Sequence, residues 1–350
     1  MKTFTKNLLI ASFAIATIAL STSGIARADQ PAVKSNNGNA GENPNYMNGR
    51  HQILEPGDDP VIVTPTKELV GASVRSGRAG LYIGTVDNSD INYRINSAVM
   101  TGLKVQLIWY GSWSNVSSTS PSANNYQGFT TKFLTDLNSQ PRWTMNGNYY
   151  QKISGVPTNV PIAYSFASAS IARNTSKYRE PLSQSSIYQI AKDFLGNNKS
   201  DPSTLYLVLT SSNVSVKGFG TSFCGWHSYN STSKMKYSFV GDPANVAGCL
   251  PQNIGPNYFA ADAMVSVLVH EIEETATDPQ LNAWYSANGN ENADKCAWTW
   301  GSGLTTVANG SYANLTLNGV NYLIQQGFKL SGLKASSSTT DTWSGACAIG

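Results

Sequence analysis

The sequence predicts an α/β fold in which buried strands alternate with amphipathic helices. Residues 104–111 and 205–210 are apolar nearly throughout, as in strands that are covered on both faces of a sheet. Residues 126–137 and 186–195 carry apolar side chains at helical spacing, and a proline or a glycine lies just beyond each. Because such alternation builds layered structures, we expect an α/β sandwich with a mixed sheet.

Shorter elements complete this expected sandwich. Residues 214–228 and 236–240 are predicted as edge strands or a hairpin, and a third helix is expected from about Phe259. Near the end of the chain, two short strand segments flank Asn318 and Gly319. An Asn-Gly pair between two strands is a strong signal for a two-residue turn, so a C-terminal β-hairpin is expected.

Residues 1–28 have the parts of a secretory signal peptide. Lys2 and Lys6 precede the apolar run 8–20, and Ala26 and Ala28 provide the small residues of a cleavage site. That run is too short for a permanent transmembrane helix, which needs about 18 or more apolar residues, and no other stretch reaches this length. We therefore expect a secreted, extracellular protein.

The rest of the chain divides into an extension and one domain. Residues 29–66 are rich in Asn, Gly, Pro and Asp and lack the apolar residues of a core, which predicts a disordered N-terminal extension. A propeptide that covers a cleft is the alternative. No linker divides residues 67–350, so we expect a single domain there.

Composition restricts the class of partner. Removal of the signal peptide takes away three basic residues and no acid, so the net charge of +3 falls to zero. Only 13% of all residues are charged, against about 25% in an average protein. A neutral chain lacks the basic footprint for nucleic acid or a membrane surface, so neither is expected as a partner. Nothing indicates the oligomeric state.

The four cysteines predict two disulfides. All lie in the C-terminal third of a chain that is expected to enter an oxidising compartment, and none forms a C-x-x-C motif of the kind that binds zinc. Three pairings are possible. We favour the two local ones, Cys224 with Cys249 and Cys296 with Cys347.

The segment Val265–Pro279 is an apolar helical run that ends in one histidine and several acids. His270 and Glu274 are four residues apart, so they share one helix face at a separation of about 6 Å. Glu271 lies beside them. This is the layout of the H-E-x-x-H zinc helix, in which the interposed Glu is the general base, with Glu in place of the second His. The alternative is a polar helix end whose acids are solvated, although acids in a last turn oppose the helix dipole and call for compensation.

A catalytic zinc needs three protein ligands and one open position. Asp278 continues the face of His270 and Glu274, but a proline follows it and disfavours helical geometry. Glu291 and Asp294 come after a glycine-containing loop that would return them to the helix. We favour Asp294 as the third ligand over Glu291 and Asp278.

His227 is the other histidine of interest. Near the metal it would donate to an oxyanion or act as a ligand. A packed imidazole in a disulfide-tied loop is an equal alternative.

Several motifs resemble the phosphate-induced protein/EXORDIUM family, whose members are secreted and best known from plant cell walls. They are Val99-Met100-Thr101-Gly102, Leu107-Ile108-Trp109-Tyr110-Gly111, Leu209-Thr210-Ser211-Ser212 and Cys224-Gly225-Trp226-His227. The His-Glu-Ile-Glu-Glu-Thr-Ala-Thr-Asp-Pro helix end resembles a bacterial branch of the family. The resemblance runs from about Ala98 to the C-terminus and implies no reaction.

Two functions follow as hypotheses. The first is a secreted zinc-dependent hydrolase with a zincin-like α/β sandwich, a metallopeptidase-like enzyme acting on an extracellular peptide or protein, or on cell-wall material. There Glu271 would take a proton from water, and residues 214–240 would align an extended substrate. The second is a noncatalytic extracellular or cell-wall-associated binding protein with a structural ion such as calcium.

Overall fold

The computed structural model describes residues 80–113, 126–257 and 260–350. The expected signal peptide and N-terminal extension, and the first residues of the expected domain, lie outside the described residues. The strands are β1 (Ile91–Arg94), β2 (Lys104–Tyr110), β3 (Tyr150–Ile153), β4 (Val156–Asn159), β5 (Ser165–Ile171), β6 (Thr204–Thr210), β7 (Gly225–Asn230), β8 (Met235–Gly241), β9 (Trp284–Ser286), β10 (Thr305–Thr306), β11 (Tyr312–Ala313), β12 (Leu315–Leu317), β13 (Val320–Tyr322), β14 (Gly327–Ser336) and β15 (Thr340–Ala348). The helices are α2 (Tyr126–Leu137), α3 (Pro141–Thr144), α4 (Gln184–Leu195) and α5 (Ala261–Thr277), with short 3-10 turns η2 (Met145–Asn148), η3 (Pro243–Asn245), η4 (Ala247–Cys249) and η5 (Asp294–Cys296).

A five-stranded sheet forms one layer, in the order β5-β2-β6-β8-β7. The first four strands are parallel, and β2 and β6 pair in register from Lys104 with Thr204 to Tyr110 with Thr210. The last strand, β7, runs antiparallel to β8 and forms one edge. The sheet is therefore mixed, as the sequence predicts.

Helices cover both faces of this sheet and create two cores. On one face, Ile187 and Ile190 of α4 pack in a cluster with Ile108 and Val208 of the sheet. On the other face, the apolar stripes of α2 and the body of α5 pack in a larger cluster with the opposite side chains of the same strands, such as Leu107. Successive side chains of a strand point to opposite faces, which is why β2 and β6 are apolar almost throughout.

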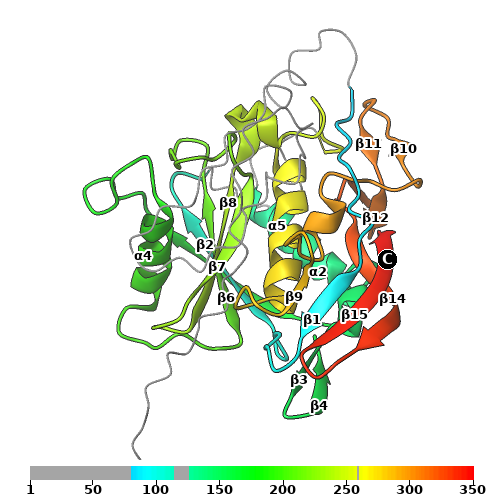
Figure 1. Ribbon diagram of the computed structural model, residues 1–350. Helices are drawn as coiled ribbons and strands as arrows, with labels where there is room; N and C mark the ends of the chain where they lie inside the picture. The colour runs from blue at the N-terminus through cyan, green and yellow to red at the C-terminus, as the bar shows by residue number, and fades with distance from the viewer. Residues whose placement is uncertain (1–79, 114–125, 258–259) are drawn as a thin grey trace, which may run out of the picture. The chain divides into compact units, whose positions relative to one another are not determined.

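A second sheet, antiparallel and four-stranded, was not predicted from the sequence. Its order is β14-β15-β1-β9, and Ile91 of β1 pairs with Trp343 of β15 on one side and Ser286 of β9 on the other. Helix α5 runs between the two sheets (Figure 1). Side chains of both sheets and of α5 share the larger core. Every residue of α5 is buried as a result, its acids included.

The outcome for the other predicted elements follows from this topology. Helices α2 and α4 confirm the helical periodicity, and β12 and β13 form the hairpin around Asn318 and Gly319, whose φ angles of 45° and 79° suit a two-residue turn. Residues 214–224 were wrongly predicted as strand, because only Gly225–Asn230 extends along β8. The segment 236–240 is strand, but it lies between β6 and β7 and is no edge.

Both preferred disulfides are confirmed, as is the mixed α/β class. Cys224, which directly precedes β7, is bonded to Cys249 of η4. Cys296 of η5 is bonded to Cys347 of β15, a strand of the second sheet. Each disulfide therefore ties a short segment that approaches α5 to another part of the fold.

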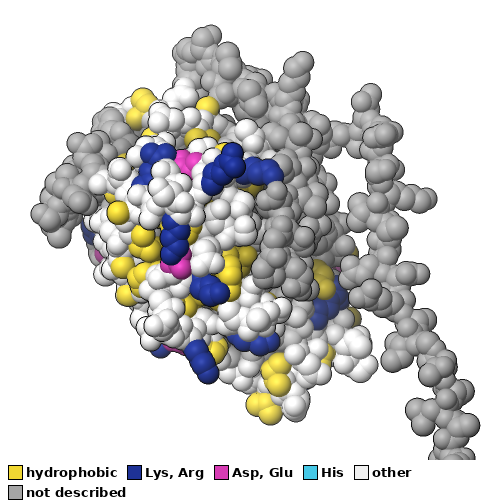
Figure 2. All heavy atoms as spheres, turned by 90° about the vertical axis from the view of Figure 1, so that its left-hand side faces the viewer, with side chains coloured by type: hydrophobic (Ala, Val, Ile, Leu, Met, Phe, Trp, Pro, Cys, Tyr) yellow, Lys and Arg dark blue, Asp and Glu magenta, His cyan; other side chains and the backbone are white. Residues whose placement is uncertain are grey.

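On the face that carries α4, the charged side chains of the described residues that are visible are spread out rather than clustered (Figure 2). Lys and Arg side chains are scattered over it among neutral and hydrophobic ones, and no histidine is visible there (Figure 2). Two basic side chains near α4 are ion-paired, Lys177 with Asp193 at 2.8 Å and Arg173 with Glu180 at 2.7 Å. In the described part of the chain, no helix is long and apolar enough to cross a membrane.

Candidate metal centre

Seven polar residues that the sequence singled out meet at the C-terminal half of α5. They come from four places in the fold: β7, the helix itself, the loop after β9, and η5. All are almost fully buried, His227 being the most exposed at 9%. We call them the His-carboxylate cluster, and its members are His227, His270, Glu271, Glu274, Asp278, Glu291 and Asp294.

Glu274 lies at the middle of the cluster. Its Oε1 atom is 3.0 Å from His270 Nε2 and accepts a hydrogen bond of 3.0 Å from the backbone N–H of Asp294. Its Oε2 atom is 3.5 Å from Nδ1 of His227. His270 Nε2 is also 3.5 Å from Asp294 Oδ1. Glu274 thus contacts both histidines and also the segment with Asp294, which the sequence predicted to return to α5.

His227 reaches the cluster from the edge strand β7. Nδ1 of its imidazole is 3.7 Å from Glu271 Oε2, and Nε2 is 3.5 Å from Glu291 Oε2. Strand β7 can approach the helix so closely because Gly225 has no side chain. A Cβ atom at Gly225 would lie 2.7 Å from both Glu271 Oε1 and Val267 Cγ1. The sequence left the place of His227 undecided, and the structure puts it among the acids.

Asp278 ends α5 and has a structural task as well. It adopts a non-helical conformation, φ −138° and ψ 59°, as expected for a residue before proline. Its Oδ1 atom accepts hydrogen bonds from the backbone N–H groups of Asn282 and Ala283, at 2.6 and 2.7 Å. These bonds turn the chain back toward β9, so Asp278 directs Glu291 and Asp294 to the helix.

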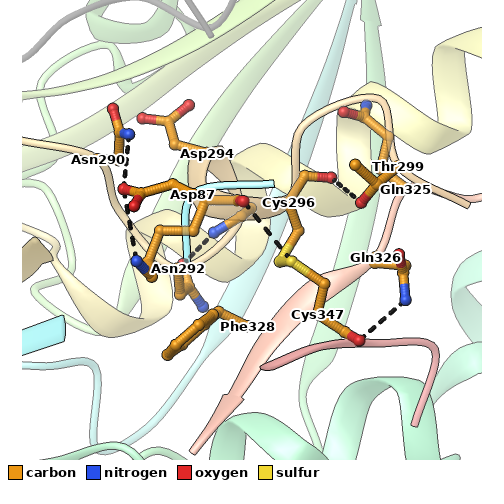
Figure 3. The surroundings of a disulfide bond; sticks show 12 residues. Asp87, Asn290, Asn292, Asp294, Cys296, Thr299, Gln325, Gln326, Phe328 and Cys347 are labelled. Atoms are coloured by element: carbon orange, nitrogen blue, oxygen red, sulfur yellow. Dashed lines mark hydrogen bonds and ion pairs between the residues drawn. A yellow bond between two sulfur atoms is a disulfide. The ribbon is translucent and has the colours of Figure 1, made fainter. Parts of the chain in front are cut away.

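The Cys296–Cys347 disulfide and its neighbours hold the segment that carries Asp294 (Figure 3). Asp294 and Cys296 are the two ends of η5, and in Figure 3 the Asp294 carboxylate points away from the disulfide. Beside it, Asp87 accepts a hydrogen bond of 2.9 Å from Asn290 and lies 3.4 Å from the buried ammonium group of Lys295. These contacts restrict both ends of the loop on which Glu291 and Asp294 lie.

Burial and mutual charge move the pKa values of the cluster apart. Burial, with the charge of Glu274, raises the pKa of Glu271 to about 7 in spite of His227. Burial also opposes the ionisation of Glu274, but His270 and His227 lower the pKa of Glu274 below its ordinary value. Burial and the charges of Glu274, Asp278 and Asp294 raise the pKa of Glu291 well above its ordinary value. Neighbouring carboxylates that differ in this way are suited to different roles, one ionised and one exchanging a proton.

The two imidazoles are held in their charged form. Burial disfavours a charge on His227, but its contacts with Glu271 and Glu274 raise the pKa of His227 to about 10. For the same reasons, with Glu274 and Asp294 as the main acids, the pKa of His270 lies well above its ordinary value. Protonated imidazoles therefore supply the positive charge of the cluster.

The sequence analysis inferred that a bound metal compensates the acids crowded at the end of α5. The structure shows that protein groups compensate one of them. Glu273 is this acid, and Arg142 compensates it instead, because the Glu273 carboxylate forms a buried two-atom ion pair with the Arg142 guanidinium. Asn146 Nδ2 donates a further hydrogen bond of 3.0 Å to Glu273. No sequence pattern connects Arg142 to α5. Protein groups thus satisfy Glu273, whereas both oxygens of Glu271 are buried without a hydrogen-bond partner.

A cavity of about 320 Å³ lies at the other end of α5. None of the seven cluster residues lines it. Its lining residues include Tyr126, Gln252, Asp262 and Leu323.

Residues 91–329, more than half of the chain, match the conserved region of phosphate-induced protein 1. The chain belongs to this family. All seven residues of the His-carboxylate cluster lie inside the region that matches the phosphate-induced protein 1 family.

Curated relatives come from Arabidopsis thaliana. The chain is 25% identical over 268 residues to Protein EXORDIUM-like 3, which is 65% of this chain and 73% of the relative. It is 27% identical over 233 residues to Protein EXORDIUM-like 5, or 57% of this chain and 62% of the relative. It is 26% identical over 265 residues to Protein EXORDIUM, or 65% of this chain and 82% of the relative. No solved structure matches the chain.

Proposed function

We propose that this member of the family is a secreted, zinc-dependent hydrolase of the metallopeptidase-like kind. One observation carries the proposal: His270, Glu274 and Asp294 converge from two elements, while Glu271 is buried beside them with neither oxygen hydrogen-bonded. A buried carboxylate without a hydrogen-bond partner is costly, so we interpret Glu271 as a group with a task. Accepting a proton is the task that its position after His270 suggests.

The donors suit a transition metal better than calcium. Zinc binds imidazole nitrogen and carboxylate oxygen at about 2.0–2.2 Å, which puts two ligands of a tetrahedral site about 3.4 Å apart. Nε2 of His270 is 3.0 Å from Glu274 Oε1 and 3.5 Å from Asp294 Oδ1, close to that separation. Calcium would require six to eight oxygen ligands and would leave the imidazoles unused.

A bound zinc ion would supply Lewis-acid chemistry, polarising a carbonyl group and favouring deprotonation of water. Glu271, whose pKa is raised to about 7, would accept the proton from water and later pass it to the leaving amine. His227, held protonated beside Glu271 at 3.7 Å, would donate to the negative charge that develops on the carbonyl oxygen.

The edge strand supports a peptide-like substrate. Strand β7 is antiparallel to β8, forms one edge of the sheet and lies next to α5. An extended peptide can add to a sheet edge through main-chain hydrogen bonds once that edge is accessible, and most residues of β7 are buried. The substrate would be an extracellular peptide or protein, or cell-wall material, with neither nucleic acid nor a membrane as partner.

The test combines metal content with turnover on the same preparations. Glu271→Gln keeps the size of the side chain and removes its capacity to accept a proton, so the variant should bind as much metal as the parent and hydrolyse a peptide library about 100-fold more slowly, or worse. His270→Ala and Glu274→Ala should lose both metal and activity. Glu180→Gln, outside the cluster, is the matched control and should change neither quantity.

Two results would contradict the proposal. A zinc-bound Glu271→Gln variant with full activity would remove Glu271 from its role as general base. Purified parent protein without zinc, and without zinc uptake in titration, would remove the metal centre altogether.

A noncatalytic binding protein with a structural ion is the second candidate. It is favoured by the burial of the whole cluster and by the position of the cavity at the opposite end of α5. Under this alternative, Glu271→Gln should be silent in every assay, and removal of the ion should lower stability without loss of any hydrolysis.

A further inference from the structure

The two oxygens of Glu274 face different histidines on different elements. Oε1 lies 3.0 Å from His270 Nε2 within α5, and Oε2 lies 3.5 Å from His227 Nδ1 on β7. A carboxylate that presents one oxygen to each of two imidazoles has the disposition of a bridging ligand. In two-metal sites such a bridge joins ions about 3.5–4 Å apart.

Donor atoms around Glu274 form two separate groups. One group is His227, Glu274 and Glu291, and the other is His270, Glu271 and Glu274. In each group the three ligand atoms lie within 4.8 Å of one another, as donors to one ion must. Only Glu274 belongs to both. Asp294, at 3.5 Å from His270, adds a further oxygen on the second side.

The charge of the cluster also favours two ions. Five carboxylates and two imidazoles are buried together, and imidazoles that bind metal are neutral. If metal binding displaced every proton from the five acids, one divalent ion would leave a buried net charge of about −3, and two ions would leave about −1. A buried net charge is costly, so the second ion would remove much of the penalty that the first leaves. The unpartnered Glu271 oxygens are an independent sign that a cation belongs here.

We propose that the cluster holds two divalent transition-metal ions bridged by Glu274. One ion is bound by His270 and Glu274 together with Asp294, whose Oδ1 atom is 3.5 Å from His270 Nε2 and takes the ligand position so that Glu271 stays available as the base. The other is bound by His227, Glu291 and Glu274. This inference rests on the metal binding in the proposed function and specifies its stoichiometry. It makes His227 a metal ligand. His227 would then not donate a proton to the carbonyl oxygen of a substrate.

The experiment counts metal ions per chain in the full-length protein. Metal-free parent is titrated with Co²⁺, whose absorption reports ligand number and geometry, and the zinc content of dialysed protein is measured independently. The parent should saturate at two ions per chain. His227→Ala and His270→Ala should each saturate at one, and Glu274→Ala should bind neither ion tightly. Glu180→Gln should still bind two.

The parent titration decides the question even if a variant does not fold. Saturation at one ion per chain would overturn the two-ion proposal, as would an unchanged count of two in His227→Ala. One ion with hydrolysis that depends on Glu271 would leave the proposed function intact while excluding the bridge. Two ions without any hydrolysis would support the bridge and contradict the enzyme.

Discussion

The last turns of α5 bury carboxylates on two faces, and the two faces balance the negative charge by different means. Glu273 meets the guanidinium of Arg142 and the amide of Asn146. Glu271 and Glu274 meet two imidazoles and three further acids. Both sets lie within a few residues on the same helix, and both are buried.

The difference lies in what the positive partner can do. A guanidinium is a hydrogen-bond donor only and offers no lone pair to a metal ion. The Arg142–Glu273 pair therefore provides no nitrogen ligand for a metal. An imidazole can give up its proton and offer the nitrogen to a metal ion. The His-carboxylate cluster can therefore exchange protons for metal, whereas the Arg142 side of the helix only holds it in place.

The largest effect is expected from Arg142→Met. The substitution leaves Glu273 buried without its cation, which costs about 3–5 kcal/mol of unfolding free energy. Chemical denaturation of metal-free protein would measure the loss. Arg142→Met combined with Glu273→Leu should recover part of it, because the uncompensated charge is then gone. A loss below about 0.5 kcal/mol in the single variant would contradict the interpretation that Arg142 balances the buried charge of Glu273.

Zinc should stabilise the fold by binding to the His-carboxylate cluster, on the side of α5 that does not carry Glu273. A ligand that binds only folded protein adds about 2.7 kcal/mol at a concentration 100 times its dissociation constant. Denaturation with and without zinc should show this gain in the parent and lose it in Glu274→Ala. Glu180→Gln, with an ion pair outside the cluster, should keep the gain in full. Equal stabilisation of Glu274→Ala would place the zinc elsewhere.

Local patterns predicted the elements whose contacts are local or repeat along the chain. Helical spacing identified α2 and α4, continuous apolar runs identified β2 and β6, and an Asn-Gly pair identified one hairpin. The second sheet was missed because β1 pairs with β15 almost 250 residues away and β14 is interrupted by two register shifts. Neither distant pairing nor irregular register leaves a period in the sequence.

The site was predictable to the same extent. The helical repeat alone predicts that His270 and Glu274 share one face. The glycine-containing loop before Asp294, together with the nearby Cys296, predicts that Asp294 returns to the helix. The sequence treated Asp278, Glu291 and Asp294 as alternatives, whereas the structure gathers all three around Glu274. The close approach of β7 depends on Gly225, and nothing before the structure showed which helix that glycine faces.

Gly225→Ala should disturb the cluster without removing any of its members. The new Cβ atom would lie 2.7 Å from Glu271 Oε1, so β7 and α5 must separate slightly. Overpacking of this kind costs about 1–3 kcal/mol. Metal affinity should fall with it, since His227 moves with β7. Gly303→Ala is the control, because a Cβ there meets nothing within 4 Å and should leave stability and metal affinity unchanged.

The smallest effect concerns a carboxylate just outside the cluster and depends on pH. Burial opposes the ionisation of Asp87, but hydrogen bonds from Ser89 and Asn290 and the charge of Lys295 lower the pKa of Asp87 from 3.8 to about 2. A pKa that is lower in the folded state gives stability that is present above pH 3.8 and is lost as the pH falls through about 2.

We expect the Asp87 contribution to be about 1 kcal/mol, because Asp87 is only partly buried and solvent screens part of its charge. The unfolding free energies of the parent and Asp87→Asn should therefore differ at about pH 5 and converge toward about pH 2. The variant should also bind metal more weakly, since Asp87 holds Asn290 and Lys295 at the two ends of the loop that carries Glu291 and Asp294. A gap in stability that stays constant over this range would show that Asp87 acts through packing and hydrogen bonds rather than through its charge.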